Sequence, residues 1–202
     1  MHRIIFHIDV NSAFLSWTAC GLLEEGGVDT PPTDIREIAS VIGGSEKSRH
    51  GIVLAKSTLA KQYGIVTGEP LFQARRKCPG LVVVPPNYQL YVRKSDQLIR
   101  MLHEYTPLIQ QYSIDEAWMD MTGIQEAPAD PMGFATGLKD RIHRELGFTV
   151  NIGISVNKLL AKMASDFEKP DKIHTLFPSE IEKKMWHLPV RTLFFTGRAA
   201  AQ

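Results

Sequence analysis

Two carboxylates stand side by side in this chain, Asp115 and Glu116, within the run YSIDEAWMD that extends from Tyr112 to Asp120. Strand-forming apolar residues flank the pair, and uncompensated negative charge in such surroundings is costly. A bound divalent cation would compensate it. Because neighbouring side chains of a regular strand point to opposite faces, both can reach one ion only at a bend, so we place them at a hairpin corner. Taken alone, such a pair is more often a solvated turn.

A third carboxylate, Asp9, ends the opening apolar run that starts at Ile4. This pattern predicts a buried central strand with the acid at the carboxyl edge of a sheet. If the corner at 115–116 lies beside that edge, three hard oxygen ligands converge, supplemented by the carbonyl of Val10. A set with many carboxylates and few Cys or His suits Mg²⁺ rather than zinc.

Two Mg²⁺ ions held by Asp9, Asp115 and Glu116 could activate an attacking hydroxyl and hold a triphosphate, which is the geometry of nucleotidyl transfer. Phosphates need cations beyond the metals, and Lys61 and Lys169 are candidates. For any single lysine, a plain surface role is the commoner case. A permanent protein cation that neutralises any one of the three carboxylates, or an Asp9 distant from the other two, would argue against this proposal.

The composition predicts an ordinary globular protein. The chain has 202 residues, 44% apolar and 22% charged, which allows one domain of ordinary size, or one domain with a small insertion. A net charge of +1 argues against a uniformly basic surface for duplex nucleic acid. The interrupted N-terminal apolar run resembles neither a signal peptide nor a membrane span, so we expect a cytoplasmic protein without a membrane partner.

Neither the cysteines nor the clustering of basic residues indicates a site by itself. The cysteines, Cys20 and Cys78, lack metal-ligand spacing and are expected to be reduced. Basic residues cluster locally, and most such clusters are solvated faces. The two clusters are Arg75-Arg76-Lys77, and Lys158 with Lys162 and Lys169.

The order of elements predicts an α+β fold, with a mixed sheet and helices packed against one face. An insertion of roughly fifty residues interrupts this sheet, which resumes at 81–84. Ser12 is expected to cap the first helix, and the polar segment 45–50 to join a hairpin. Strands are expected at 4–9, 38–42, 51–55, 81–84, 108–112, 117–121 and 148–154. Helices are expected after Ser12, at 57–64, 67–78, 91–105 and 131–146, and from Ser155 or Asn157 to Phe167.

The tail and two early segments have other patterns. Breakers predict loops at 24–27 and 30–33. A short helix near 181–185 is followed by no convincing element beyond Gly197-Arg198. We therefore expect the chain to be a fragment, cut inside a further helical domain.

Three ordered motifs carry a family resemblance: HIDVNSAF at 7–14, YSIDEAWMD at 112–120 and GISVNKLLAKMASDFEKP at 153–170. They resemble the palm motifs of Y-family translesion DNA polymerases of the bacterial polymerase IV and V kind. The stretches 51–64 and 68–79 resemble the fingers of that family, so the similarity covers nearly the whole chain.

The resemblance implies a polymerase palm, with a mainly antiparallel sheet, at residues 1–20 and 80–170. It implies small α/β fingers at 21–79 and the start of a truncated helical thumb at 171–202, without the family's little-finger domain. The implied activity is template-directed, damage-bypass DNA synthesis with dNTP, primer-template DNA and two Mg²⁺ ions. The resemblance also allows a sliding clamp as a partner, bound through the missing C-terminal region. Without the absent domains the fragment can lack activity, because weak contacts with DNA are lost.

Matching residue by residue, Asp9 and Asp115 resemble the aspartates that hold both metals, and Glu116 the carboxylate near the primer 3′ hydroxyl. Lys169 resembles the triphosphate-binding lysine. Phe14 falls where the family has its steric gate, a ring under the sugar that collides with a ribonucleotide's 2′ hydroxyl. From its pattern alone, Phe14 belongs to a helix core.

The match departs from the family in the fingers. Many relatives carry Tyr and Arg where this chain has Thr58 and Lys61. A hydroxyl and an ammonium still bind phosphate oxygens, but Lys lacks the bidentate fork of Arg. Asp120 receives no role from the match and is expected to be structural.

Two alternatives stay open. A nucleotidyl cyclase also uses acidic residues on a palm-like sheet to hold two metals. A catalytically inactive DNA-repair scaffold would retain the same fold. A cyclic product formed from ATP or GTP without primer would favour the first, and a lack of metal-dependent dNTP binding would favour the second.

Overall fold

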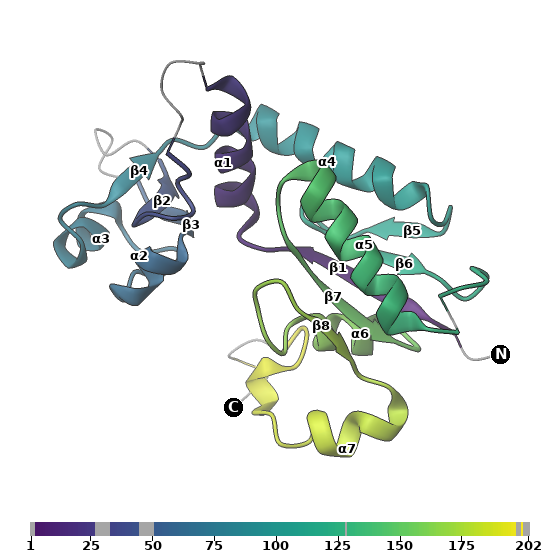
Figure 1. The fold of residues 1–202 in the computed structure, drawn as a ribbon. Coiled ribbons are helices and arrows are strands. Elements are labelled where there is room, and N and C mark those ends of the chain that lie inside the picture. Colours follow the sequence, from purple (N-terminus) through teal and green to yellow (C-terminus); the bar gives the residue numbers. More distant parts are fainter. Residues whose placement is uncertain (1–2, 27–32, 45–50, 128, 197–198, 200–202) are drawn as a thin grey trace. The chain divides into compact units, whose positions relative to one another are not determined.

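The computed structural model of the chain describes residues 3–26, 33–44, 51–127, 129–196 and 199. The predicted loop segments at 27, 30–32 and 45–50, and Gly197-Arg198, lie outside the described residues. The chain forms two compact units, which are described separately below (Figure 1). The larger unit consists of Met1–Asn11 and Asp96–Gln202, and the smaller of Ser12–Ser95.

The larger unit is built on a five-stranded sheet in the order β5-β6-β1-β7-β8. The central strand is antiparallel to both of its neighbours, and both it and β7 are buried along their whole length. Only β7 and β8 run parallel, so the predicted mainly antiparallel mixed sheet is confirmed. The strands are β1 (Ile5–Val10), β5 (Ile109–Gln111), β6 (Glu116–Asp120), β7 (Val150–Ser155) and β8 (Ile173–Thr175).

Helices cover both faces of this sheet, which corrects the expectation of one covered face. The ring of Phe6 lies 6.2 Å from that of Phe134 in α5 (Pro131–Leu146). The next residue of β1, His7, pairs with Gly153, on which α6 (Lys158–Ser165) packs. Because successive strand residues alternate between faces, α5 and α6 lie on opposite sides.

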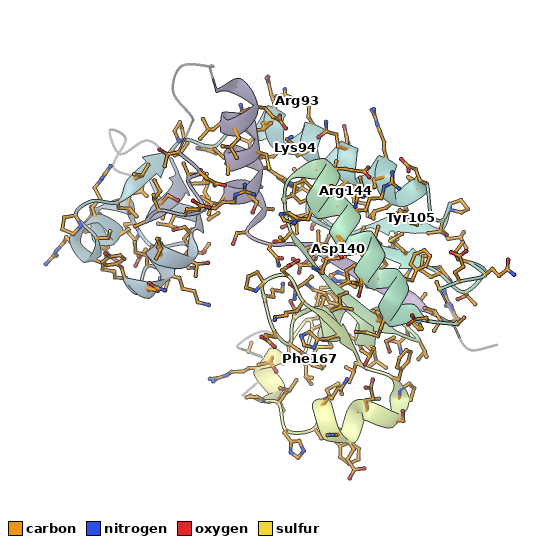
Figure 2. The ribbon with its side chains drawn as sticks, viewed as in Figure 1. Arg93, Lys94, Tyr105, Asp140, Arg144 and Phe167 are labelled. Carbon is orange, nitrogen blue, oxygen red and sulfur yellow. The ribbon has the colours of Figure 1, made fainter. Side chains whose placement is uncertain are left out.

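The helix α5 is anchored by aromatic and charged contacts. Tyr105 follows α4 (Tyr88–His103) and lies against α5 (Figure 2), with its ring 5.6 Å from that of Phe134. Arg141 donates a hydrogen bond to the Tyr105 hydroxyl at 3.1 Å. The remaining elements of the larger unit are α7 (Ile181–Lys184) and the 3-10 helices Pro178–Glu180 and Val190–Thr192.

The smaller unit holds a three-stranded sheet in the order β3-β2-β4. β2 (Ser40–Gly43) is antiparallel to β3 (Val53–Lys56), as predicted, and parallel to β4 (Val82–Val84). The expectation that 81–84 resumes the main sheet is therefore wrong. An apolar run has the same pattern in either sheet, and here Leu81 packs into the small core with residues of α2 (Thr58–Gln62) and α3 (Leu71–Lys77).

The first helix, α1 (Ala13–Glu25), is buried around most of its circumference rather than along one stripe. The predicted side-chain cap by Ser12 is also wrong. Its backbone is left-handed (φ 46°, ψ 51°), and its side chain makes no capping hydrogen bond. Ser57 and Asn157, by contrast, accept hydrogen bonds from Ala60 N at 3.0 Å and Leu160 N at 2.9 Å.

The predicted loop at 24–27 is wrong for Glu24 and Glu25, which form the last residues of α1. The α+β class is confirmed, and the predicted helices and remaining strands form with small differences at their ends. Cys20 and Cys78 are buried, and neither forms a disulfide in the described part of the chain. In the part of the chain that the structure describes, no helix has the length and apolar content needed to span a bilayer.

Candidate active site

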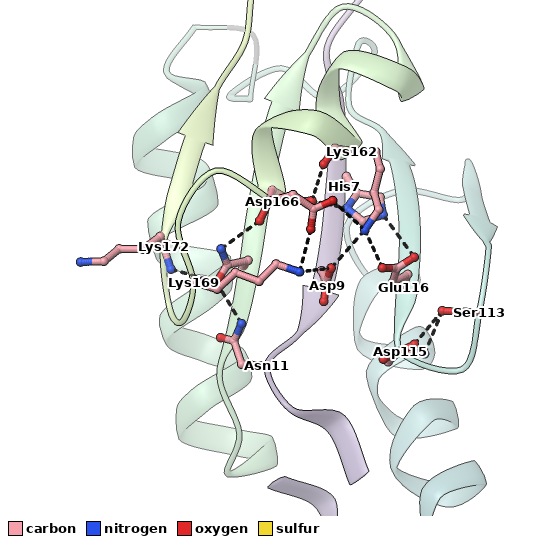
Figure 3. Close-up of polar contacts among 12 residues, drawn as sticks. His7, Asp9, Asn11, Ser113, Asp115, Glu116, Lys162, Asp166, Lys169 and Lys172 are labelled. Carbon is pink, nitrogen blue, oxygen red and sulfur yellow. Dashed lines mark hydrogen bonds and ion pairs between the residues drawn. The ribbon is translucent and has the colours of Figure 1, made fainter. Parts of the chain in front are cut away.

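The hairpin β5-β6 brings the acidic pair to the end of the central strand. Asp9 and Glu116 are directly opposite each other in the antiparallel β1-β6 ladder. Asp115 precedes β6, and its carbonyl accepts a hydrogen bond from Val10 N at 3.0 Å. Tyr112 N donates to the Glu116 carbonyl at 2.9 Å and closes the corner. The three carboxylates therefore lie at one end of β1, as the hairpin placement predicted (Figure 3).

Two lysines join this group. Lys162 Nζ lies 3.2 Å from Asp9 Oδ2 and 2.6 Å from Glu116 Oε1. Lys169 Nζ lies 2.6 Å from Asp9 Oδ2. Asp166 contacts both ammonium groups, at 3.3 Å from Lys162 and 2.8 Å from Lys169 (Figure 3). The side chains of Lys162 and Asp9 are each only 8% exposed, so the inner part of this ionic network is buried, while Lys169 and Asp166 lie at its exposed edge.

The ionic network lowers the pKa of one of its carboxyl groups and raises that of another. Burial disfavours the Asp9 anion, but the charges of Lys169 and Lys162 outweigh burial and hold the pKa of Asp9 below its ordinary value. Burial raises the pKa of Glu116, with the Asp9 charge acting in the same direction and the Lys162 hydrogen bond opposing both. Burial opposes the charge of Lys162 and Lys169, yet the carboxylates raise the pKa of each. Both lysines are therefore cationic at neutral pH.

A buried protein cation thus does sit on two of the three carboxylates, and it counts against a preformed metal site. Among the described residues, no three His, Cys, Asp or Glu side chains are arranged to hold a metal ion as they stand. Asp115 differs, because within the same residues it joins no ion pair and accepts a hydrogen bond from the Ser113 hydroxyl at 2.7 Å. Asp9, Glu116 and Asp166 face the two ammonium groups, and Asp115 is a fourth carboxylate beside them, so four carboxylates and two ammonium groups leave a surplus of two negative charges.

The donors that remain fit a hard divalent cation. All of them are oxygens, and the site carries uncompensated negative charge. Val10, whose carbonyl is the expected fourth ligand, is the buried last residue of β1. A cation shared by Asp9 and Glu116 would have to take the place that the Lys162 ammonium holds.

A shell of uncharged groups supports the network. His7 lies on the same face of β1 as Asp9, and its Nδ1 is 2.8 Å from the Ser165 hydroxyl. Burial, followed by the Lys162 charge, lowers the pKa of His7 to about 3, so the ring is neutral. Its Nε2 lies 4.0 Å from Glu116 Oε2. A neutral ring here adds no further charge to the site.

Two asparagines fix the segment that carries Lys169. Asn151 donates from its amide to the carbonyls of Ser165 and Glu168. Asn11 accepts a hydrogen bond from Asp171 N at 2.9 Å. Neither was predicted, although Asn11 stands in the first motif and Asn151 on a predicted strand, where a buried amide is a signal of a specific hydrogen bond.

The other expected residues belong to the smaller unit. Phe14 is half-buried in α1 and stacks on Tyr91, with 4.5 Å between ring centroids and 9° between planes. Thr58 and Lys61 are exposed on α2. Burial, and then the charge of Lys61, lowers the pKa of Lys56, so these two cations are neighbours. Lys56 is a phosphate-binding candidate that the sequence patterns did not indicate.

Comparison with known proteins places the site in a family. The model of the impB/mucB/samB family matches residues 8–166. DNA polymerase IV of Clostridium acetobutylicum is 55% identical over 199 residues, covering 98% of this chain and 49% of that protein. DNA polymerase IV of Moorella thermoacetica is 44% identical over 158 residues, covering 78% and 40%. The chain thus spans about half the length of these curated relatives.

Solved structures show the same fold. DinB from Sulfolobus solfataricus aligns over 98% of this chain and 55% of its own, with a TM-score of 0.82 and 22% identity. The insertion ternary complex of Dbh DNA polymerase aligns over 97% and 55%, with a TM-score of 0.84 and 23% identity. The fold is that of the Y-family polymerases, and the resemblance that the three motifs carry is confirmed. The range matched by the family model includes all three carboxylates of the corner, and the chain belongs to the impB/mucB/samB family.

Proposed function

We propose that this chain is the catalytic part of a template-directed DNA polymerase of the translesion type. It transfers a nucleotide from a dNTP to the 3′ hydroxyl of a primer. The observation that carries the proposal is the convergence of Asp9, Asp115 and Glu116 at one end of β1. Its relatives named DNA polymerase IV support it, since they match nearly the whole chain.

The carboxylates and the carbonyl of Val10 would hold two Mg²⁺ ions. When bound, such ions activate the attacking hydroxyl and stabilise charge on the phosphates. Asp9 and Asp115 have oxygen donors for both ions, and Glu116 would lie near the primer 3′ hydroxyl. The charged Lys169, tied to Asp9, is poised to exchange that carboxylate for a triphosphate oxygen.

The smaller unit would supply further nucleotide contacts. Thr58, Lys61 and the neighbouring Lys56 offer one hydroxyl and two ammonium groups for phosphate oxygens. The half-exposed ring of Phe14 would stack under the deoxyribose and exclude a 2′ hydroxyl. We assign the palm to residues 1–20 and 80–170 except for β4, the fingers to 21–79 together with β4, which pairs with β2, and the start of the thumb to 171–202. Primer-template DNA and dNTP are the proposed partners. Binding of a sliding clamp remains a prediction. The proposed location is cytoplasmic.

The test is product analysis with the full-length protein. With Mg²⁺, four dNTPs and a primed template, the primer should lengthen by template-matched nucleotides, including opposite an abasic site. Leaving out the template or chelating Mg²⁺ with EDTA should abolish extension. A cyclic nucleotide made from ATP or GTP alone would favour the cyclase instead. A protein that neither extends primers nor binds dNTP in a metal-dependent way would be a scaffold.

A further inference from the structure

The ammonium of Lys162 stands between the two paired carboxylates of the β1-β6 ladder. It is 2.6 Å from Glu116 Oε1 and 3.2 Å from Asp9 Oδ2, and the Glu116 side chain is only 16% exposed. The helix α6, which carries Lys162, packs closely against the sheet. A Cβ added at Gly153 would lie 1.9 Å from the Ala161 carbonyl, so only glycine allows α6 to approach the sheet this far. Lys162 is therefore positioned over β1 by the packing of the fold.

Two buried carboxylates that face each other repel unless a cation lies between them. The Lys162 ammonium supplies that cation, and Asp9 and Glu116 supply its hydrogen-bond acceptors. A divalent ion shared by the same two carboxylates needs the same place, and two cations at such short range repel strongly in a poorly hydrated site. Occupation by the ammonium and by the ion is therefore mutually exclusive.

We propose that Lys162 is an internal counter-cation that competes with the divalent ion for Asp9 and Glu116. It holds the carboxylates together when no ion is bound and leaves them when one binds. This inference deepens the proposed function and depends on its metal site. Asp166, one helical turn further along α6, provides the place to which the ammonium withdraws, because its Oδ2 is already 3.3 Å from Lys162 Nζ and its side chain is 42% exposed.

The competition can be measured as the affinity for Mn²⁺ alone, from the electron paramagnetic resonance signal of the free ion. Lys162→Met should bind Mn²⁺ about tenfold or more tightly than the wild type, because the ammonium that lies between Asp9 and Glu116 no longer has to be displaced. Lys158→Met is the matched control. It removes the same charge from the first residue of the same helix, but Lys158 is exposed and hydrogen-bonds Gln110. Its affinity should stay within about twofold of the wild type.

A second variant and a second readout guard against misfolding. Lys162→Arg keeps the charge and should keep Mn²⁺ binding as weak as in the wild type. In wild-type protein carrying ¹³Cε-lysine, Mg²⁺ should shift the Lys162 resonance and leave that of Lys158 in place. Unchanged affinity in Lys162→Met, weaker affinity, or a Lys162 resonance that ignores Mg²⁺ would each overturn the proposal.

The failure of the proposed function has a different signature. If Mn²⁺ binds the wild type and Asp9→Asn abolishes that binding, the metal site stands whatever Lys162→Met shows. If neither the wild type nor any Lys162 variant binds Mn²⁺, the metal site fails, and both the proposed function and the competition fail with it.

Discussion

At the scale of single residues, Phe14 has a packed side and an exposed side. One side of its ring stacks on Tyr91, and the Tyr88 ring meets it edge-on at 6.1 Å. Trp17 in the same helix is fully buried, whereas the Phe14 ring is only half-buried. The half-exposed ring is therefore available to a ligand, which is what a sugar-contacting role requires.

Phe14→Ala should admit ribonucleotides. Removing the ring removes the collision with a 2′ hydroxyl, so the preference for dNTP over NTP in primer extension should fall at least about tenfold. Because the ring is only half-buried, the loss of stability should be smaller than the ~3–5 kcal/mol of a fully buried phenylalanine. Tyr88→Ala, which removes a ring contact but leaves Phe14 in place, should retain the preference. Unchanged sugar selectivity in Phe14→Ala would show that Phe14 only packs in the helix core.

His7 predicts a pH dependence of stability. Its pKa is lowered from 6.5 to about 3 by burial and then by Lys162, while in the unfolded chain it is ordinary. Between those values the unfolded state binds more protons. The stabilisation is therefore complete above pH 6.5 and is lost as the pH falls toward 3, with a slope approaching ~1.4 kcal/mol per pH unit. The charged groups that face the ring are Asp9, Glu116, Lys162, Asp166 and Lys169.

Urea unfolding in EDTA at pH 6.5 and 5.5 measures this slope. The free energy of unfolding should fall more steeply with acidification in the wild type than in His7→Gln, which has no imidazole to protonate and keeps the charged neighbours. Equal slopes in the two proteins would show that the buried ring does not control the acid sensitivity of this site.

At the scale of elements, Gly153 determines how closely α6 packs on the sheet. Any Cβ at this position meets the backbone of α6, which cannot move aside as a flexible side chain can. Gly153→Ala should therefore lower the free energy of unfolding by about 3 kcal/mol. Gly137 lies on the exposed side of α5, and a Cβ added there would meet no atom within 4 Å. Gly137→Ala should therefore leave the free energy of unfolding unchanged or raise it by up to ~1 kcal/mol. Urea denaturation compares them, and a Gly153→Ala protein as stable as Gly137→Ala would contradict the close packing.

Local patterns were enough to predict the acidic corner and most of the elements, but not β8 (Ile173–Thr175). The apolar run before Asp9 predicts a buried strand directly. A pair of carboxylates between two strand patterns is compatible with few backbone conformations other than the tip of a hairpin. The partners of the elements were not predictable in the same way. The sequence of β4 does not indicate which sheet the strand joins. Strand β8 has only three residues, too few for a periodic pattern.

The ionic network escaped prediction for a related reason. Lys158 and Lys162 stand one helical turn apart in the same motif, and nothing in the sequence separates the exposed lysine from the buried one. The difference arises from packing, since α6 crosses β1 above Asp9. Charge pairing of this kind depends on three segments that are distant in sequence, so side-chain type and spacing cannot show it.

At the scale of the whole molecule, the charge is unevenly distributed. The chain carries a net charge of +1, yet the end of β1 gathers four carboxylates and two lysines. A local excess of negative charge on a nearly neutral protein attracts cations to one place. This is the property that a metal-dependent nucleotidyl transferase needs, and the chain has it within a fold shared with the Y-family polymerases.

The most direct test of this account is primer extension by the full-length protein carrying Asp115→Asn, with Asp120→Asn as the matched control. Asp120 lies at the other end of the same strand, where it pairs with Arg3 at 2.7 Å. Asp115→Asn should slow extension about 10³-fold or more, because ligand loss removes several kcal/mol of transition-state stabilisation. Asp120→Asn should extend primers at close to the wild-type rate. Wild-type extension by Asp115→Asn would contradict the account.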